Sequence, residues 1–317
     1  MAMAACTRYA SHPACPMKPL DLLVVIVVPI IWGFGFTLAK GTFDAFPPIF
    51  LMSLRFGIAA LILVWFVRPM WDRTGRLLAT TFVGGTVAYS LQFTGLSGMY
   101  ASTAVLVVQG EVVFASLLAA IVFKDRLNRW QAGAMVVALV GIAFIAGDPK
   151  VQGDPWPFAM VALGGLSWAG GQVLVKSLGP VGGLRLIAWF AAFSAPQFLI
   201  ASLVFEQGQW HAVTAASWSD WAKVFYLSVI MTVAGYALWY RLVGIYRLNQ
   251  IVPFLLLVPV TSIAGGILVL GEELTRNVAI GGIIVLVSVT FIHLSQARPP
   301  ALRNAAPNQD RLLPPDR

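Results

Sequence analysis

The stretch IWGFGFTLAKG at residues 31–41 returns later in the chain as SWAGGQVLVKSLG at residues 167–179. In both stretches a tryptophan, Trp32 and then Trp168, stands eight positions before a lysine. Such an echo indicates that the chain consists of two related halves. Repeats of this kind are typical of membrane proteins with a central substrate path.

The composition places the chain in a lipid environment. Of its 317 residues 59% are apolar and only 11% are charged, which leaves too little polar surface for a soluble domain. A helix of roughly 20 apolar residues is long enough to cross a hydrocarbon core of about 30 Å. We expect ten such helices, near residues 22–41, 48–67, 77–97, 100–123, 131–147, 156–176, 184–205, 219–241, 249–271 and 278–295.

The basic residues predict the orientation of these helices. The net charge is +8, but the positive residues sit in short connections rather than on one aromatic-rich face, so nucleic acid is not an expected partner. With a cytoplasmic N-terminus the connections on the outside hold only Lys40, Lys150, Lys223 and Arg276. Those on the inside hold Arg8, Lys18, Arg68, Arg73, Arg76, Lys124, Arg126, Arg129, Lys176, Arg185, Arg241, Arg247, Arg298, Arg303, Arg311 and Arg317. The positive-inside rule therefore predicts that both termini are cytoplasmic.

Five helices per half is an odd number, so the two halves are expected to run in opposite directions. We predict an all-α integral membrane protein of ten transmembrane helices, arranged as two inverted five-helix repeats around a central cavity. Residues 1–20 are the expected cytoplasmic N-terminal tail, and residues 296–317, rich in proline, the expected disordered cytoplasmic tail. The repeats are expected at 21–147 and 156–295, joined by a linker at 148–155.

A second register relates the ends of the halves. Tyr89 lies 147 residues before Tyr236. The same offset separates Leu127, Phe144 and Ile145 from Leu274, Phe291 and Ile292. It also sets Glu111-Val112 of the first half opposite Val258-Pro259 of the second, so the two halves carry different residues at these corresponding positions.

Several short motifs occur in a fixed order. They are Trp32-Gly33 followed by Lys40, Arg55-Phe56, Pro259-Val260, and Gly271-Glu272 followed by Leu274. Over residues 20–295 this order and its doubling resemble the EamA-type ten-helix exporters of the drug/metabolite transporter superfamily.

The resemblance implies a ten-helix bundle around a cavity that opens alternately to the two sides, with no ATP-binding module. The chain indeed contains no GxxxxGK[ST] phosphate loop. The first half departs from the family pattern at Val112, where a helix-breaking proline is expected, and at Lys124, where a glycine is expected. The first half therefore gives no reason to expect the fourth segment to be kinked, as the ninth is expected to be by Pro259.

Glu111 is the only acid deep inside an expected span, about 16 Å from the outer end of its helix at ~1.5 Å per residue. A carboxylate at such a depth normally faces the bundle interior or a water-filled path, so Glu111 is a candidate proton relay or a partner for a substrate amine. The alternative is a structural pair with Arg55. The Arg55 guanidinium can bind a carboxylate through two hydrogen bonds, whether that of Glu111 or of a substrate, or it can snorkel toward the outer surface.

Aromatic and amide side chains supply the other candidates for the substrate path. The expected cavity wall consists of Tyr89, Gln92, Phe93, Tyr236, Trp239 and Tyr240, because tyrosine and tryptophan join an apolar face to a hydrogen-bond donor. Tyr240 could instead be an interfacial anchor.

Trp32 and Trp168 lie near the expected midplane, where an anchoring belt does not explain them; substrate contact and packing against glycine are the two alternatives. Gln109 and Gln172 are polar residues within spans that must find partners, and a substrate is one candidate. Pro259 is expected to bend the ninth segment and to act in gating.

The sequence shows no metal-ligand spacing and no nucleophile triad, so we expect neither an enzyme nor a cofactor nor a metal. The acidic residues of the outer connections are expected to be solvated; they are Asp148, Asp154, Glu206, Asp220, Glu272 and Glu273.

With the family resemblance, these observations predict a bacterial-type inner-membrane transporter that exports small metabolites by alternating access without ATP hydrolysis. Amino acids, including aromatic ones, are the leading substrate class, and the expected partners are a small-molecule substrate and membrane lipid. A broader drug or nucleoside-type exporter, a lipid-modifying membrane enzyme and a non-transporting scaffold are the alternatives.

Overall fold

The computed structural model describes residues 17–123, 129–246 and 248–296, and these residues form helices and no strand. The cysteines Cys6 and Cys15, most of both tails, and Lys124 and Leu127 lie outside the described residues.

Eight of the described helices are long and apolar enough to cross a membrane, so the protein is a multi-pass membrane protein. These spans are Pro19–Lys40, Pro48–Phe66, Ala101–Val122, Arg129–Ala146, Trp156–Ser177, Gly183–Phe205, Trp218–Ile245 and Pro253–Leu270.

The other two expected spans are also helical. Residues 77–97 fall in a continuous run of α3 (Thr74–Thr81), η3 (Phe82–Val87) and α4 (Ala88–Ser97). Residues 278–295 fall in α16 (Arg276–Gln296), which contains a shorter apolar helix. That the chain crosses the membrane ten times stays a prediction.

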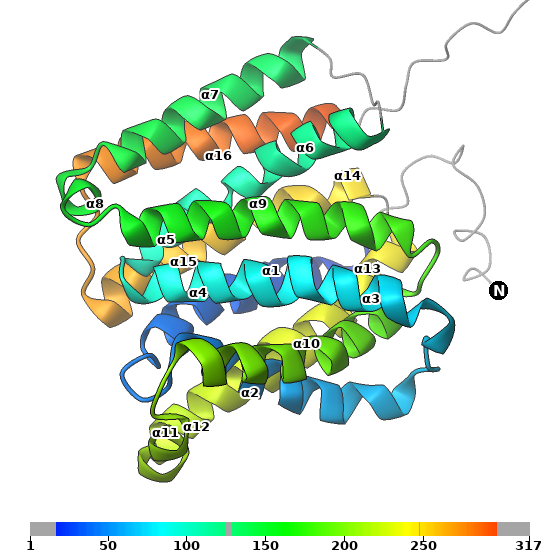
Figure 1. Ribbon diagram of the computed structural model, residues 1–317. Coiled ribbons are helices and arrows are strands. Elements are labelled where there is room, and N and C mark those ends of the chain that lie inside the picture. Colours follow the sequence, from blue (N-terminus) through cyan, green and yellow to red (C-terminus); the bar gives the residue numbers. More distant parts are fainter. Residues whose placement is uncertain (1–16, 124–128, 247, 297–317) are drawn as a thin grey trace, which may run out of the picture.

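The long helices lie side by side as a bundle (Figure 1). At one edge α7 (Arg129–Ala146) packs against α16, and at the other α2 (Pro48–Leu63) packs against α10 (Gly183–Phe205). Between these edges, α1 (Pro19–Lys40) packs against α15 (Leu257–Leu270). Helix α9 (Trp156–Ser177) packs against both α4 and α6 (Gly110–Phe123).

The fourth and ninth segments are each interrupted at equivalent points. The fourth consists of α5 (Ala101–Val108) and α6, and between them the Val112 N–H donates to the Gln109 carbonyl at 3.2 Å, a three-residue step in place of the α-helical four. In the ninth, a 3₁₀ turn η5 (Val252–Leu256) precedes α15. Because α6 and α15 begin 147 residues apart, the interruption recurs in both halves, although Val112 gave no reason to expect it in the first.

The third and eighth segments also share an irregularity, a wide π-helical stretch. It is η3 in the third and η4 (Tyr226–Ala234) in the eighth, where α12 (Trp218–Phe225) precedes it and α13 (Gly235–Ile245) follows. Each stretch offers a main-chain carbonyl to a helix of the other half. The Ser167 hydroxyl donates to Val83 at 2.7 Å, and the Trp32 indole N–H donates to Met231 at 3.1 Å.

Close backbone contact accompanies the first of these stretches. A Cβ placed on Gly84 would lie 2.7 Å from the Cα of Gly171, so α9 and η3 touch through two glycines. Larger side chains here would force the helices apart.

Glu272 and Glu206 hold the starts of helices from the other half of the chain, contrary to the expectation that they are solvated. The Glu272 carboxylate is 5% exposed and accepts hydrogen bonds from the Ala101 and Ser102 N–H groups at 2.6 and 2.9 Å. The Glu206 carboxylate accepts from Ile49 and Phe50 at 2.8 and 2.9 Å. The free N–H groups at the starts of α5 and α2 explain why these acids turn inward.

Asp148 was also expected to be solvated, but it is buried. Its carboxylate accepts hydrogen bonds from the Lys150 N–H at the start of α8 (Pro149–Gly153) and from the Thr275 hydroxyl.

The remaining elements are short. A further helix, α11 (Gln209–Ala215), lies between α10 and α12, and η1 (Val64–Phe66), η2 (Trp71–Arg73) and α14 (Leu248–Ile251) complete the described elements.

Candidate functional site

A cavity of about 500 Å³ lies in the centre of the bundle. All eleven side chains predicted for the substrate path line it, from both halves of the chain: Trp32, Arg55, Tyr89, Gln92, Gln109, Glu111, Trp168, Gln172, Tyr236, Trp239 and Tyr240.

The repeated tryptophans each pack on a tyrosine of the opposite half. The ring centroids of Trp32 and Tyr236 lie 5.0 Å apart, and those of Trp168 and Tyr89 lie 5.4 Å apart. Trp32 also lies 5.6 Å from Trp239. The tryptophan repeat and the tyrosine repeat, which follow different registers in the sequence, therefore meet in two equivalent pairs across the cavity.

Arg55 is buried in the cavity wall, and none of the described carboxylates pairs with it. Its side chain on α2 is 1% exposed, its Nε donates to the Thr232 hydroxyl at 2.9 Å, and its guanidinium carbon lies 5.1 and 5.7 Å from the ring centroids of Phe56 and Tyr89. One terminal nitrogen of the guanidinium has no hydrogen-bond partner. Since a buried charge is costly unless it is paired, this arrangement fits a site whose missing partner is an anion.

Glu111 lies in the first turn of α6 and faces the same cavity. The described residues give it no ion pair, so the alternative of a direct pair with Arg55 is not what the structure shows. Glu111 also borders a second groove of about 330 Å³ between α6 and α9, whose floor includes Ala115, Ser116 and Ala119.

Phe93, expected in the cavity wall, lines it as well, whereas several other lining residues were not predicted from the sequence: Phe36, Val105, Val108, Val112, Met231, Leu255 and Val258. A signal existed for Phe36, which follows Trp32 by four residues and so shares its helix face. Most of the others are apolar residues in apolar helices, where composition does not separate cavity from core.

Pro259 is buried in the first turn of α15, directly after the 3₁₀ turn η5. The N–H groups of a first turn have no partner within their own helix, so proline costs little there. Pro259 thus marks a change of helix type next to the cavity residue Val258 rather than a bend inside α15.

No group of three or more His, Cys, Asp or Glu residues that could hold a metal occurs within the described ranges. The chemistry of the cavity wall is instead that of one cation, one acid, three amides and many rings. Such a wall can bind a small polar solute without reacting with it.

Fold, cavity and apolar spans define the class: a helical membrane protein with a solute-sized central cavity. A family model for the EamA-like transporter family matches residues 20–147 and again residues 155–294, and the chain belongs to that family. The family to which the sequence motifs pointed is therefore confirmed.

Named relatives agree with this class. A "Probable amino-acid metabolite efflux pump" of Salmonella typhimurium is 29% identical over 85% of this chain and 93% of its own length. A protein of the same name from Escherichia coli is 27% identical over the same shares. One solved crystal structure superposes over 92% of this chain and all of its own with a TM-score of 0.59; at 17% identity it supports the fold alone. Family and relatives point to a metabolite exporter rather than an enzyme.

Proposed function

We propose that the protein exports amino acids, aromatic ones among them, from the cytoplasm of a bacterial cell across the inner membrane. The observation that carries this proposal is Arg55, a buried guanidinium that faces the central cavity with one unsatisfied nitrogen and no anionic partner in the described part of the chain. A substrate carboxylate supplies both the charge and the acceptor.

The rest of the cavity suits the other parts of an amino acid. Glu111 provides the negative charge that an ammonium group requires. The cluster of Trp32, Tyr236 and Trp239 provides ring faces for an aromatic or aliphatic side chain. Two opposite charges and an aromatic cluster in one cavity match a zwitterion better than they match a nucleoside, which has no carboxylate for Arg55.

Alternating access between two inverted halves is the proposed mechanism. Its support is that helix pairing keeps its pattern when the halves are exchanged: α1 packs on α15 as α9 packs on α6, and α2 packs on α10, its counterpart. Proteins built this way move the halves against each other around one central site. Pro259 and the break at Gln109 lie beside the cavity, where small changes of helix direction would gate it. The termini are cytoplasmic in the proposed orientation.

Counterflow into proteoliposomes tests the proposal. Vesicles are loaded with unlabelled phenylalanine, and the entry of labelled phenylalanine is compared for wild type, Arg55→Gln and Thr232→Val. We expect Arg55→Gln to lower kcat/KM at least tenfold, because it removes a charged hydrogen-bond donor from the bound carboxylate. Thr232→Val leaves the charge of Arg55 and removes two contacts of the neutral hydroxyl, the one from Arg55 Nε and the one to the Leu227 carbonyl, so it should cost less than about threefold.

Phenylalaninamide, which lacks the carboxylate, is the matched substrate control: its counterflow should be weak in wild type and insensitive to Arg55→Gln. Equal counterflow of phenylalanine by wild type and Arg55→Gln would remove the role of Arg55, and absence of any amino-acid counterflow in wild type would remove the proposed function.

A further inference from the structure

A further recess lies at the end of the bundle where α2 ends and α10 begins. It has a volume of about 490 Å³ and is lined by Arg68, Arg185 and Arg241 together with the start of α10 and part of α13. We call it the arginine cleft. The three arginines come from three different segments of the chain, and no Asp or Glu is among the described residues that line it.

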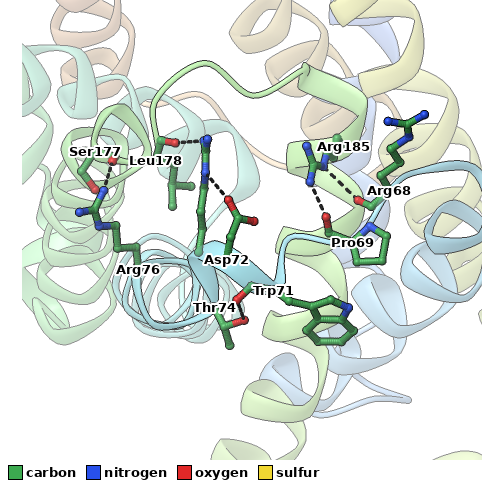
Figure 2. A network of polar contacts seen from close by, with 10 residues as sticks. Arg68, Pro69, Trp71, Asp72, Thr74, Arg76, Ser177, Leu178 and Arg185 are labelled. Atoms are coloured by element: carbon green, nitrogen blue, oxygen red, sulfur yellow. Dashed lines mark hydrogen bonds and ion pairs between the residues drawn. The ribbon is translucent and has the colours of Figure 1, made fainter.

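The segment that carries Arg68 is held rigidly by its main chain. The Arg68 carbonyl accepts from Arg185 Nε at 3.0 Å and from the Trp189 indole N–H at 2.9 Å, and a second nitrogen of Arg185 donates to the Pro69 carbonyl. Figure 2 shows Arg185 reaching both carbonyls while the Arg68 guanidinium points away from them. The backbone at Arg68 is therefore held against α10, and the exposed side chain extends from this fixed point.

The arginines of the cleft differ in how their charge is balanced. Arg241 pairs with Asp21 at 2.9 Å. Arg185 bonds only to neutral carbonyls, and the described structure gives the Arg68 guanidinium neither a hydrogen bond nor an ion pair. Two positive charges thus remain unbalanced at one recess, which raises the local concentration of anions.

The cleft adjoins the central cavity through Tyr240, a residue that lines both. Its ring lies so close to Gly183 that a Cβ on this glycine would overlap the ring. On the cavity side the Tyr240 ring lies 6.1 Å from that of Tyr236. A solute that passes Tyr240 thus leaves the arginine cleft and enters the cavity that holds Arg55.

We propose that the arginine cleft is the cytoplasmic entry site, where Arg68 and Arg185 bind the carboxylate of the solute before it moves past Tyr240 to Arg55. This inference rests on the proposed export of carboxylate-bearing solutes from the cytoplasm. The positive-inside rule places arginines on this side of the membrane in any case, but it does not require two of them to border one recess without an acidic partner among the described residues.

The test is equilibrium binding of labelled N-acetylphenylalanine, which has a carboxylate and no ammonium group, to full-length protein in phosphatidylcholine nanodiscs. We expect Arg68→Gln to weaken binding about three- to tenfold, corresponding to one charge-assisted contact at a partly solvated site. Arg68→Lys keeps the charge and should stay within about twofold of wild type. Because the Arg68 side chain is exposed, neither change should affect folding.

Arg76→Gln is the matched control. Arg76 carries the same charge on the same side, but it donates to the Ser177 carbonyl and does not line the cleft (Figure 2). Its loss should leave N-acetylphenylalanine binding unchanged.

Three results would overturn the proposal: no binding by wild type, equal binding by wild type and Arg68→Gln, or equal losses in Arg68→Gln and Arg76→Gln. Phosphatidylglycerol separates the two sources of an anion. If adding it to the nanodiscs abolishes the Arg68-dependent binding, a lipid phosphate occupies the cleft and the entry role is wrong. Counterflow of phenylalanine tests the proposed function separately. If counterflow is absent while binding of N-acetylphenylalanine still depends on Arg68, the proposed function is wrong although the binding result stands.

Discussion

Replacing Glu272 tests whether the buried carboxylate at the start of α5 holds the bundle together. The side chain follows the end of α15 and reaches a helix start that is 170 residues away in the chain. Its two oxygens accept from Ala101 N–H and Ser102 N–H, which no helical carbonyl can satisfy.

The magnitude follows from those two hydrogen bonds. A hydrogen bond to a charged group contributes about 1.5–3 kcal/mol, and loss of a helix cap costs about 0.5–2 kcal/mol. Since the two bonds share one carboxylate, the effects are not additive, and we expect Glu272→Ala to destabilise the protein by roughly 2–4 kcal/mol. Glu272→Gln keeps one acceptor oxygen and should cost about half as much.

The assay is the midpoint of heat-induced loss of monodisperse protein in detergent, with every variant heated at the same rate because such unfolding is irreversible. A change of 1 kcal/mol shifts the midpoint by roughly 2–4 °C in domains of 150–250 residues and by less in longer ones, so Glu272→Ala should lower it by about 4–10 °C.

Glu273→Ala is the control, because Glu273 is the next residue, its side chain is 82% exposed and its partner is Lys150 at the surface. Exposed pairs of this kind add little to stability. If Glu272→Ala and Glu273→Ala shift the midpoint equally, the carboxylate does not act as a buried cap and the reasoning is refuted.

Three further predictions concern the interior. Gly171→Ala should destabilise the protein by roughly 1–3 kcal/mol, because its Cβ would meet the Gly84 backbone. Gly170→Ala, whose Cβ would lie 3.6 Å from the nearest side chain, should be neutral or stabilising. The thermal midpoints of the two variants check this difference. Trp32→Phe removes the donor to the Met231 carbonyl and should cost about 1 kcal/mol by the same assay, more than Trp168→Phe, since the described structure shows no hydrogen bond from Trp168. Glu111→Gln should abolish the response of transport to an imposed pH gradient while the thermal midpoint stays within a few degrees of wild type, and a retained pH response would exclude Glu111 as the proton relay.

The sequence predicted where the helices lie and which polar side chains line the cavity, because both follow from long-range patterns. Helix length follows from apolar runs, and a polar residue within a span must face a polar interior, as Arg55, Gln92 and Glu111 do. The repeats added the two tryptophans and Tyr89 with Tyr236.

Features set by single backbone contacts could not be predicted. The break at Gln109 occurs without proline, because one three-residue hydrogen bond suffices to interrupt the helix. Within the π-helical stretch η4, the Met231 carbonyl accepts a hydrogen bond from the indole of Trp32, 199 residues away, and no local residue pattern encodes that contact. Glu272 was misassigned for the same reason: an acid at a loop is normally solvated, unless a helix start from elsewhere in the chain meets it.

Two helix–helix contacts border the central cavity, that of α1 with α15 and that of α9 with α6, and we call them seams. They occupy corresponding positions in the two halves but are packed differently. At one, α1 and α15 are in contact, with the Thr37 hydroxyl donating to the Ser262 carbonyl at 3.4 Å. At the other, α6 and α9 leave a groove of about 330 Å³ that reaches Glu111 and Gln172 of the cavity wall. An exporter that works as we propose needs one closed and one open seam at a time, and exchanging their states would turn the cavity to the other side. Glu111 lies at the open seam, and its counterpart Val258 lies at the closed one. The acid that distinguishes the halves is therefore placed where a proton or an ammonium group could favour one state over the other.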